Sequence, residues 1–155
     1  MNIEIRKGTK SDIPFALNLV KELAVYEKAP DEVEVSIEEM TEWGFGSDKQ
    51  FDFYVALLDD VIVGMALYYF KYSTWKGKCL FLEDIIVTES QRGKGLGKLL
   101  FDKVVQVSKE QKVRRMEWQV LDWNTPAIEF YKKYDANLDG EWVNCKLTNH
   151  QLENM

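Results

Sequence analysis

The chain has 155 residues, of which 46% are hydrophobic and 30% charged, and its formal net charge is −6. These values indicate one folded domain over residues 1–155 and exclude a disordered chain, which would carry fewer apolar residues. A negative surface also argues against nucleic acid as a partner, because phosphate binding requires a basic face.

The small number of histidines and cysteines limits the possible reactions further. The one histidine, His150, lies in a polar tail, which argues against a histidine-based triad or a zinc centre, so we expect no metal. Cys79 and Cys145 stand apart in apolar, strand-like surroundings and are expected to be free, buried thiols. We find no apolar signal segment and no run of membrane-spanning length, and therefore expect a cytoplasmic protein that does not bind membranes.

The first third of the chain predicts one strand followed by two helices. Residues 3–7 alternate as a strand does. Apolar residues then recur at helical spacing over 13–24, and Pro30 ends that segment. Two capping pairs mark the expected helix starts: Thr9 with Asp12, and Ser36 with Glu39.

The middle of the chain predicts three strands and a helix. Residues 51–60 and 61–73 form a predicted hairpin that turns around Asp59 and Asp60. The run KCLFLEDIIV (78–87) is apolar on both faces, which is typical of a central strand. The helix that follows is expected to bury one stripe of residues: Leu96, Leu99, Leu100, Val104 and Val107.

The last third predicts a strand over 114–121, a helix over 125–134 and a final strand over 141–148. Pro126 occupies a favoured position in the first turn of that helix. The predicted order is one strand, two helices, three strands, a helix, a strand, a helix and a strand, without repeats or linkers, which indicates a mixed α/β layer fold in one domain.

A glycine-rich segment joins the central strand to the next helix. A P-loop would need Ser or Thr after the Gly97–Lys98 pair, where this chain has leucine, and the dinucleotide fingerprint would need glycine at position 98. What remains is Arg-x-x-Gly-x-Gly, made by Arg92, Gly95 and Gly97 at the start of a helix.

Such a turn can bind an anion. The first amides of a helix lack intrahelical partners, the helix dipole is positive there, and missing side chains let a diphosphate approach the backbone. Arg92, Lys94 and Lys98 can add positive charge. The alternative is a glycine-rich turn that serves only to reverse the chain.

Four longer segments carry a resemblance to a known family. They are KELAVYEK, YYFKYSTWKGKCLFLEDIIV, QRGKGLGK and DWNTPAIEFYKKYDA. Together they resemble the GCN5-related N-acetyltransferases (GNAT), and within them the diamine (spermidine/spermine) acetyltransferase branch. The resemblance implies the GNAT acyltransferase fold, an α/β fold with a mixed, mostly antiparallel central sheet flanked by helices. It further implies acetyl-CoA as cosubstrate, a small primary amine as acceptor, and a homodimer.

The resemblance also implies which residues hold the coenzyme. Strand residues would bind the pantetheine arm: Ile85, Ile86 and Val87. The glycine turn would bind the diphosphate: Arg92, Gly93, Lys94, Gly95, Leu96, Gly97 and Lys98. A second segment would line the other side of the coenzyme: Asn124, Thr125, Pro126 and Ala127.

Catalytic and acceptor residues follow from the same resemblance. Tyr131 corresponds to the family's general acid, which would protonate the leaving thiolate. The residues implied for amine binding are Tyr26, Glu27, Glu83, Glu117, Trp118 and Gln119. The family also has an acid before the tryptophan of its last strand, a position that Asp139 or Glu141 could fill.

The chemistry needs a carboxylate near the acetyl group. An alkylammonium, with a pKa of about 10, must lose a proton before it attacks a thioester. With no histidine available, we expect Glu83 to bind the cation and to take the proton through a water molecule. Asp84 is expected to be structural, because successive strand residues point to opposite faces.

Three functions remain open from the sequence. The acidic stretch over 27–39 favours a polyamine or diamine acceptor, although a charge run is usually a solvated surface. A related branch acetylates thialysine or similar amino acids, and a protein lysine is also open. A third possibility is a coenzyme A-binding module without catalysis.

Overall fold

The computed structural model describes residues 1–155, which divide into two compact units, Met1–Gln119 and Val120–Met155. The expectation of a single domain over 1–155 stays a prediction. The first unit contains a five-stranded sheet in the order β1-β2-β3-β4-β5. Its strands are β1 (Ile3–Lys7), β2 (Asp52–Leu58), β3 (Val61–Ser73), β4 (Gly77–Val87) and β5 (Met116–Glu117). Strands β1 to β4 pair antiparallel and β5 pairs parallel to β4, which confirms the predicted mixed, mostly antiparallel sheet.

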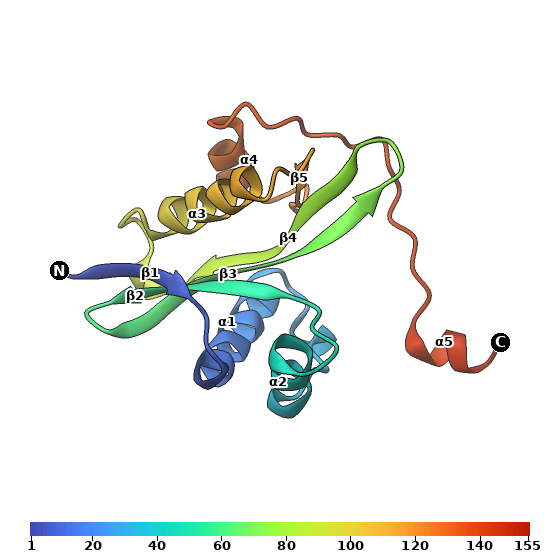
Figure 1. The fold of residues 1–155 in the computed structure, drawn as a ribbon, viewed down its shortest axis with the longest axis horizontal. Helices are drawn as coiled ribbons and strands as arrows, with labels where there is room; N and C mark the ends of the chain where they lie inside the picture. Colours follow the sequence, from blue (N-terminus) through green and yellow to red (C-terminus); the bar gives the residue numbers. More distant parts are fainter. The chain divides into compact units, whose positions relative to one another are not determined.

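Helices cover both faces of this sheet. The first unit contains α1 (Ile13–Tyr26), α2 (Ile37–Phe45) and α3 (Leu96–Glu110), with short 3-10 turns η1 (Lys10–Asp12), η2 (Pro30–Glu32) and η3 (Glu89–Gln91). Helices α1 and α2 lie on one face and α3 lies on the other (Figure 1). Both predicted capping boxes are present, Thr9 with Asp12 before α1 and Ser36 with Glu39 at α2.

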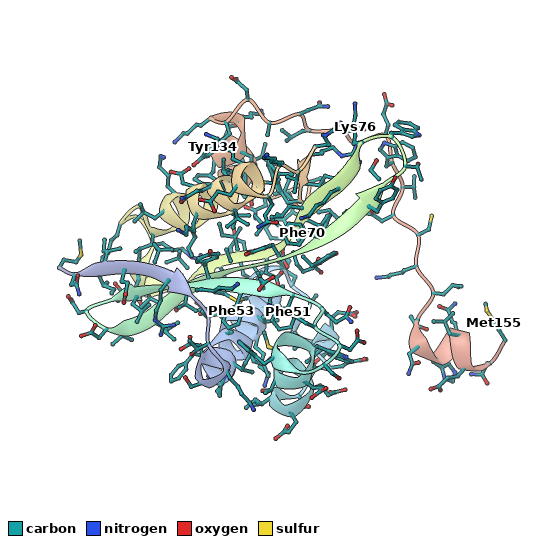
Figure 2. All side chains as sticks on the ribbon, in the orientation of Figure 1. Phe51, Phe53, Phe70, Lys76, Tyr134 and Met155 are labelled. Carbon is teal, nitrogen blue, oxygen red and sulfur yellow. The ribbon has the colours of Figure 1, made fainter.

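A hydrophobic core fills the space between the sheet and α1 with α2. Residues from α1 and from three strands share it: Ile13, Ala16, Leu17, Phe53, Met65, Leu67 and Ile86. Figure 2 labels Phe51 and Phe53 on the side of β2 that is turned toward α1 and α2. The side chains of Leu67 and Ile86 therefore mark which face of β3 and β4 is turned toward α1.

The opposite core is formed under α3. Leu96, Leu100 and Val104 are buried as the helical stripe predicted, but Leu99 is 42% exposed, so its predicted burial is wrong. Phe101 is buried instead and packs edge to face against Trp118, with ring centroids 5.2 Å apart. The buried face of α3 is therefore turned toward Phe101 and away from Leu99 relative to the prediction.

The hairpin between β2 and β3 has the predicted turn. Asp59 and Asp60 both have positive φ values, 49° and 67°. Two successive residues in this region make the type I′ turn, whose twist matches that of antiparallel strands. Short polar residues such as aspartate tolerate this conformation better than most.

The second unit departs most from the prediction. It contains α4 (Thr125–Lys132), as expected, and α5 (Asn149–Glu153), which was not expected. No strand forms over 141–148 in this unit; in the first unit, the strand predicted over 114–121 is reduced to β5. A strand needs a neighbouring backbone to bond, and in this segment Trp142 and Val143 are 74% and 83% exposed.

Both cysteines are free, as predicted, but only Cys79 is buried. Cys145 lies in the exposed segment after α4, so its predicted burial is wrong. No helix in the chain is both long enough and apolar enough to cross a membrane.

Candidate active site

The glycine turn between η3 and α3 is open to solvent. Gly93 and Gly95 both have φ values of +81°, a region that favours glycine. A side chain added at either position would meet no atom within 4 Å. Gly95 is the N-cap of α3 and supplies no side chain to cap the helix. The turn thus leaves the positive end of α3 accessible, and the residues present fit a bound diphosphate.

Arg92 braces this turn against its surroundings. Its Nε atom donates a hydrogen bond to the carbonyl of Val87 at 2.9 Å. Its guanidinium carbon lies 5.1 Å from the ring centroid of Tyr26, at the end of α1. The side chain therefore ties the end of β4 to the end of α1 and adds positive charge beside the turn.

The two lysines of the turn contact neighbours in the chain. Lys94 donates to Gln91 at 2.5 Å, and Lys98 forms an ion pair with Asp102, one helical turn away, at 2.6 Å. Both are exposed contacts of the kind that contribute little to stability. Either lysine can therefore exchange its partner for a phosphate at small cost.

Glu22 anchors the strand end that leads into the turn. Its carboxylate accepts hydrogen bonds from the Thr88 hydroxyl at 2.9 and 3.0 Å and from the Glu89 amide at 3.0 Å. Sequence reasoning missed this residue, and no local pattern could have revealed it, because Glu22 lies 66 residues before Thr88.

A β-bulge interrupts the pairing of β3 with β4 beside this site. Leu67 pairs with Asp84 and Tyr68 pairs with Leu82, so Glu83 is the extra residue. A bulge breaks the alternation of side chains along a strand. The argument that Asp84 points away from Glu83 is therefore wrong.

Both acids lie on the face of the sheet that carries α1. Glu83 accepts a hydrogen bond from the Tyr69 hydroxyl at 3.3 Å, and Tyr69 is two residues from Leu67 in the α1 core. Asp84 is two residues from Ile86, which belongs to the same core. Asp84 therefore shares the face of Ile86, and Glu83 shares the face of Tyr69, which donates to it.

These acids and Glu27, at the end of α1, form a carboxylate cluster. Burial, then the charges of Glu83 and Glu27, raise the pKa of Asp84 to about 6. Burial also raises the pKa of Glu27. No cation neutralises Asp84, and the cluster lies one residue before the strand segment 85–87. It can attract a cation and can exchange a proton near neutral pH.

Two other residues predicted for the amine site, Glu117 and Trp118, contact residues outside the carboxylate cluster. Glu117 forms ion pairs with Lys71 at 3.5 Å and Arg115 at 3.1 Å. Trp118 packs against Phe101 beneath α3. The amine-binding role of Glu117, Trp118 and Gln119 stays a prediction.

The second unit holds the predicted general acid. Asn124 caps α4 by accepting a hydrogen bond from the amide of Ala127 at 3.4 Å. Tyr131 is buried on the same helix, and its ring centroid lies 5.5 Å from that of Phe130. The roles of Asn124, Thr125, Pro126, Ala127 and Tyr131 stay predictions.

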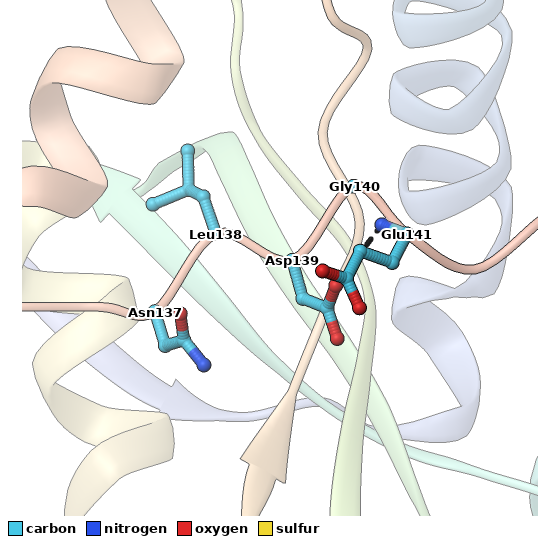
Figure 3. A pocket seen from close by; sticks show the side chains of 5 residues that line it. All are labelled: Asn137, Leu138, Asp139, Gly140 and Glu141. Carbon is cyan, nitrogen blue, oxygen red and sulfur yellow. Dashed lines mark hydrogen bonds between the residues drawn. The ribbon is translucent and has the colours of Figure 1, made fainter.

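Figure 3 shows a shallow hollow lined by one loop of this second unit: Asn137, Leu138, Asp139, Gly140 and Glu141. The amide of Glu141 donates to the Asp139 carboxylate at 3.0 Å. Both acids point into a polar hollow, and the role of either in an acceptor site stays a prediction. The chain contains no group of three or more His, Cys, Asp or Glu side chains placed to hold a metal ion.

Comparison with known proteins assigns the family. Residues 17–135 match the model of the acetyltransferase (GNAT) family. A thialysine N-epsilon-acetyltransferase from Bos taurus is 37% identical over 145 residues, covering 86% of this chain and 84% of that protein. A spermidine/spermine N(1)-acetyltransferase-like protein 1 from Homo sapiens is 33% identical over 140 residues, covering 86% of this chain and 20% of that protein.

Solved structures agree on the fold. An aminoglycoside acetyltransferase from an uncultured soil metagenomic sample superposes with a TM-score of 0.77 at 19% identity, covering 94% of this chain and 95% of that one. The mixed, mostly antiparallel sheet with helices on both faces agrees with this fold. The chain belongs to the acetyltransferase (GNAT) family, in the branch with the spermidine/spermine and thialysine enzymes, and is an N-acetyltransferase. The fold implies acetyl-CoA as its cosubstrate.

Proposed function

We propose that this enzyme transfers an acetyl group from acetyl-CoA to a primary amine of a small polyamine or diamine. The observation that carries the proposal is the cluster of Glu27, Glu83 and Asp84, which adjoins the strand leading to the open glycine turn. Three carboxylates favour a flexible acceptor with more than one positive charge.

Acetyl-CoA is expected to lie along the end of β4. The strand segment Ile85, Ile86 and Val87 offers backbone groups to the pantetheine arm. The diphosphate is expected at the open turn around Gly93, Gly95 and Gly97. Asn124 to Ala127 are proposed to line the coenzyme from its other side.

The reaction is proposed to be direct, within a ternary complex. A carboxylate of the cluster takes a proton from the ammonium, and the neutral nitrogen attacks the thioester carbonyl. A C–N bond forms, the C–S bond breaks, and Tyr131 gives its hydroxyl proton to the leaving thiolate. The acylated nitrogen then loses its second proton, which restores the Tyr131 hydroxyl and leaves a neutral amide. A backbone amide near Ile85 or Ile86 is proposed to stabilise the intermediate oxyanion.

An amine panel tests this function. Purified enzyme is mixed with acetyl-CoA and putrescine, spermidine, spermine, thialysine or lysine, and free coenzyme A thiol is measured. We expect the highest kcat/KM for a polyamine or diamine. Turnover of none of these amines would overturn the proposed function.

Salt dependence tests the attraction of the acceptor separately. The stretch from Glu27 to Glu39 is strongly acidic, and attraction between exposed charges is screened by salt. The KM for the polyamine should therefore rise with ionic strength. A KM that stays constant between low and high salt would show that this stretch does not attract the acceptor.

A thialysine-type amino acid is the second candidate acceptor. The bovine relative, with 37% identity over 84% of its length, supports it. An amino acid also carries a carboxylate, which the cluster of three acids would repel. The same panel separates the candidates, because this alternative requires thialysine to exceed every polyamine in kcat/KM.

A non-catalytic coenzyme A-binding module is the remaining alternative. It predicts that acetyl-CoA binds with measurable heat but that no amine releases thiol. Retention of Glu83, Asn124 and Tyr131 together supports an enzyme instead.

We further propose a cytoplasmic homodimer. The exposed free thiol of Cys145 is compatible with a reducing compartment. The β3–β4 hairpin, where Figure 2 labels Phe70 and Lys76, exposes Tyr72 and, at 79%, Trp75. Exposed aromatic residues are frequent at protein interfaces. Light scattering should give twice the chain mass for the wild type and a lower mass for Trp75→Ser, whereas a monomeric wild type would contradict the proposal.

A further inference from the structure

The bulge in β4 places two neighbouring acids on one face but in different surroundings. Glu83 is the extra residue of the bulge, is exposed, and accepts a hydrogen bond from Tyr69. Asp84 is half-buried and has no hydrogen bond or ion pair. Burial without a hydrogen-bond partner destabilises the charged form of a carboxylate such as Asp84.

We propose that Asp84, rather than Glu83, is the carboxylate that takes the proton from the amine. This inference rests on the proposed N-acetylation of an amine. Glu83 is then a binding group for the ammonium, held in place by Tyr69. Asp84 precedes the strand segment 85–87 directly, so its carboxylate lies at the start of the stretch expected to hold the thioester.

The charges around Asp84 suit this role. Glu83 on its own strand and Glu27 at the end of α1 are both acids, and both disfavour its ionised form. Tyr69 on β3 also faces Glu83, and burial followed by the Glu83 charge raises the pKa of its phenol, so Tyr69 stays neutral and donates. Arg92, which follows β4, is held by a backbone carbonyl and the Tyr26 ring.

The pKa of Asp84 is closer to that of the ammonium than the pKa of an ordinary carboxylate is, which favours proton transfer to Asp84. The pKa of Asp84 is about 6, raised first by burial and then by the two neighbouring acids. An acceptor closer in pKa to the ammonium, at about 10, makes the transfer less unfavourable by about 1.4 kcal/mol per pKa unit. In the step, an N–H bond of the ammonium breaks and an O–H bond forms on Asp84. The carboxylic acid returns this proton to water after the acetylated product leaves.

The test is the pH profile of kcat/KM for the best amine of the panel, in three enzymes. The wild type should lose activity as pH falls through about 6, because Asp84 is then protonated. Asp84→Asn should lower kcat by about 100-fold or more and remove this acid limb. Glu83→Gln should keep the limb but move it to lower pH, because Glu83 is one of the charges that raise the pKa of Asp84.

Three outcomes would overturn the inference. A limb that disappears in Glu83→Gln and persists in Asp84→Asn would assign the proton to Glu83. An Asp84→Asn enzyme with a raised amine KM but unchanged kcat would leave Asp84 a binding residue only. A limb that stays at the same pH in Glu83→Gln would belong to a group that the Glu83 charge does not affect, and therefore not to Asp84. This result needs no folded Asp84 variant. Failure of the proposed function is distinct, since the wild type would then turn over no amine.

Discussion

Gly97→Ala in the glycine turn should change the stability of the protein and its affinity for acetyl-CoA in opposite directions. Gly97 is the second residue of α3 and has no positive φ. An added methyl group would meet only Cγ2 of Val87, at 3.9 Å, which is an ordinary van der Waals contact. Alanine is favoured over glycine in a helix, so the free energy of unfolding should rise by about 0.5–1 kcal/mol. For a chain of this size the melting temperature should rise by about 1–4 °C.

The same methyl group should weaken acetyl-CoA binding. It would stand at the open helix start, where the diphosphate is expected to contact the Gly97 amide. One lost hydrogen bond to a charged group is worth about 1.5–3 kcal/mol, which corresponds to a Kd about 10- to 100-fold higher. Isothermal titration calorimetry with acetyl-CoA and thermal unfolding measure the two effects.

A matched control uses a glycine outside the turn. Gly77, at the start of β4, has a φ of +90° and also has open space around it. Gly77→Ala should lower stability by about 1–2 kcal/mol through backbone strain and leave the Kd for acetyl-CoA unchanged. A Gly97→Ala protein that is stabilised but binds acetyl-CoA as tightly as the wild type would refute the anion-site reasoning.

Three further changes test other parts of the molecule. Tyr131→Phe should lower kcat with little change in the Kd for acetyl-CoA, and an unchanged kcat would exclude Tyr131 as the acid. Glu22→Gln should raise the KM for acetyl-CoA several-fold, because it weakens the charged contacts that hold Thr88 and the turn; an unaltered KM would show that the turn needs no such anchor. Hydrogen bonds from Arg6 lower the pKa of Asp12 below the ordinary value of 3.8, so this carboxylate stabilises the fold above about pH 4 and loses that contribution as pH falls through its folded pKa. Asp12→Asn should therefore cost about 1.5–3 kcal/mol in urea unfolding at pH 7, and the difference should shrink toward pH 3, whereas an equal deficit at both pH values would contradict this account.

Much of the fold could be predicted from local sequence alone. Helices α1, α2 and α3 follow from apolar spacing and capping residues such as Ser36 with Glu39. The β2–β3 hairpin follows from Asp59 and Asp60, whose side chains tolerate positive φ. These features depend on residues within a few positions of one another, so the local sequence is enough to predict them.

The last segment could not be predicted in this way. The residues of 141–148 have strand composition, but a strand exists only where another backbone accepts its hydrogen bonds. Trp142 and Val143 are instead exposed. The composition of a segment gives its β-strand propensity but does not show whether a partner strand is present.

The sequence by itself determined the class of chemistry, because the four segments that resemble the GNAT acetyltransferases are local features of the chain. Only the tertiary structure decided which acids act together. The bulge opposite Leu67 turns Asp84 to the same face as Glu83, and the end of α1 brings Glu27 from 57 positions earlier in the chain. The physical reason is that strand register and helix packing are set by contacts between distant residues, which a local pattern does not contain.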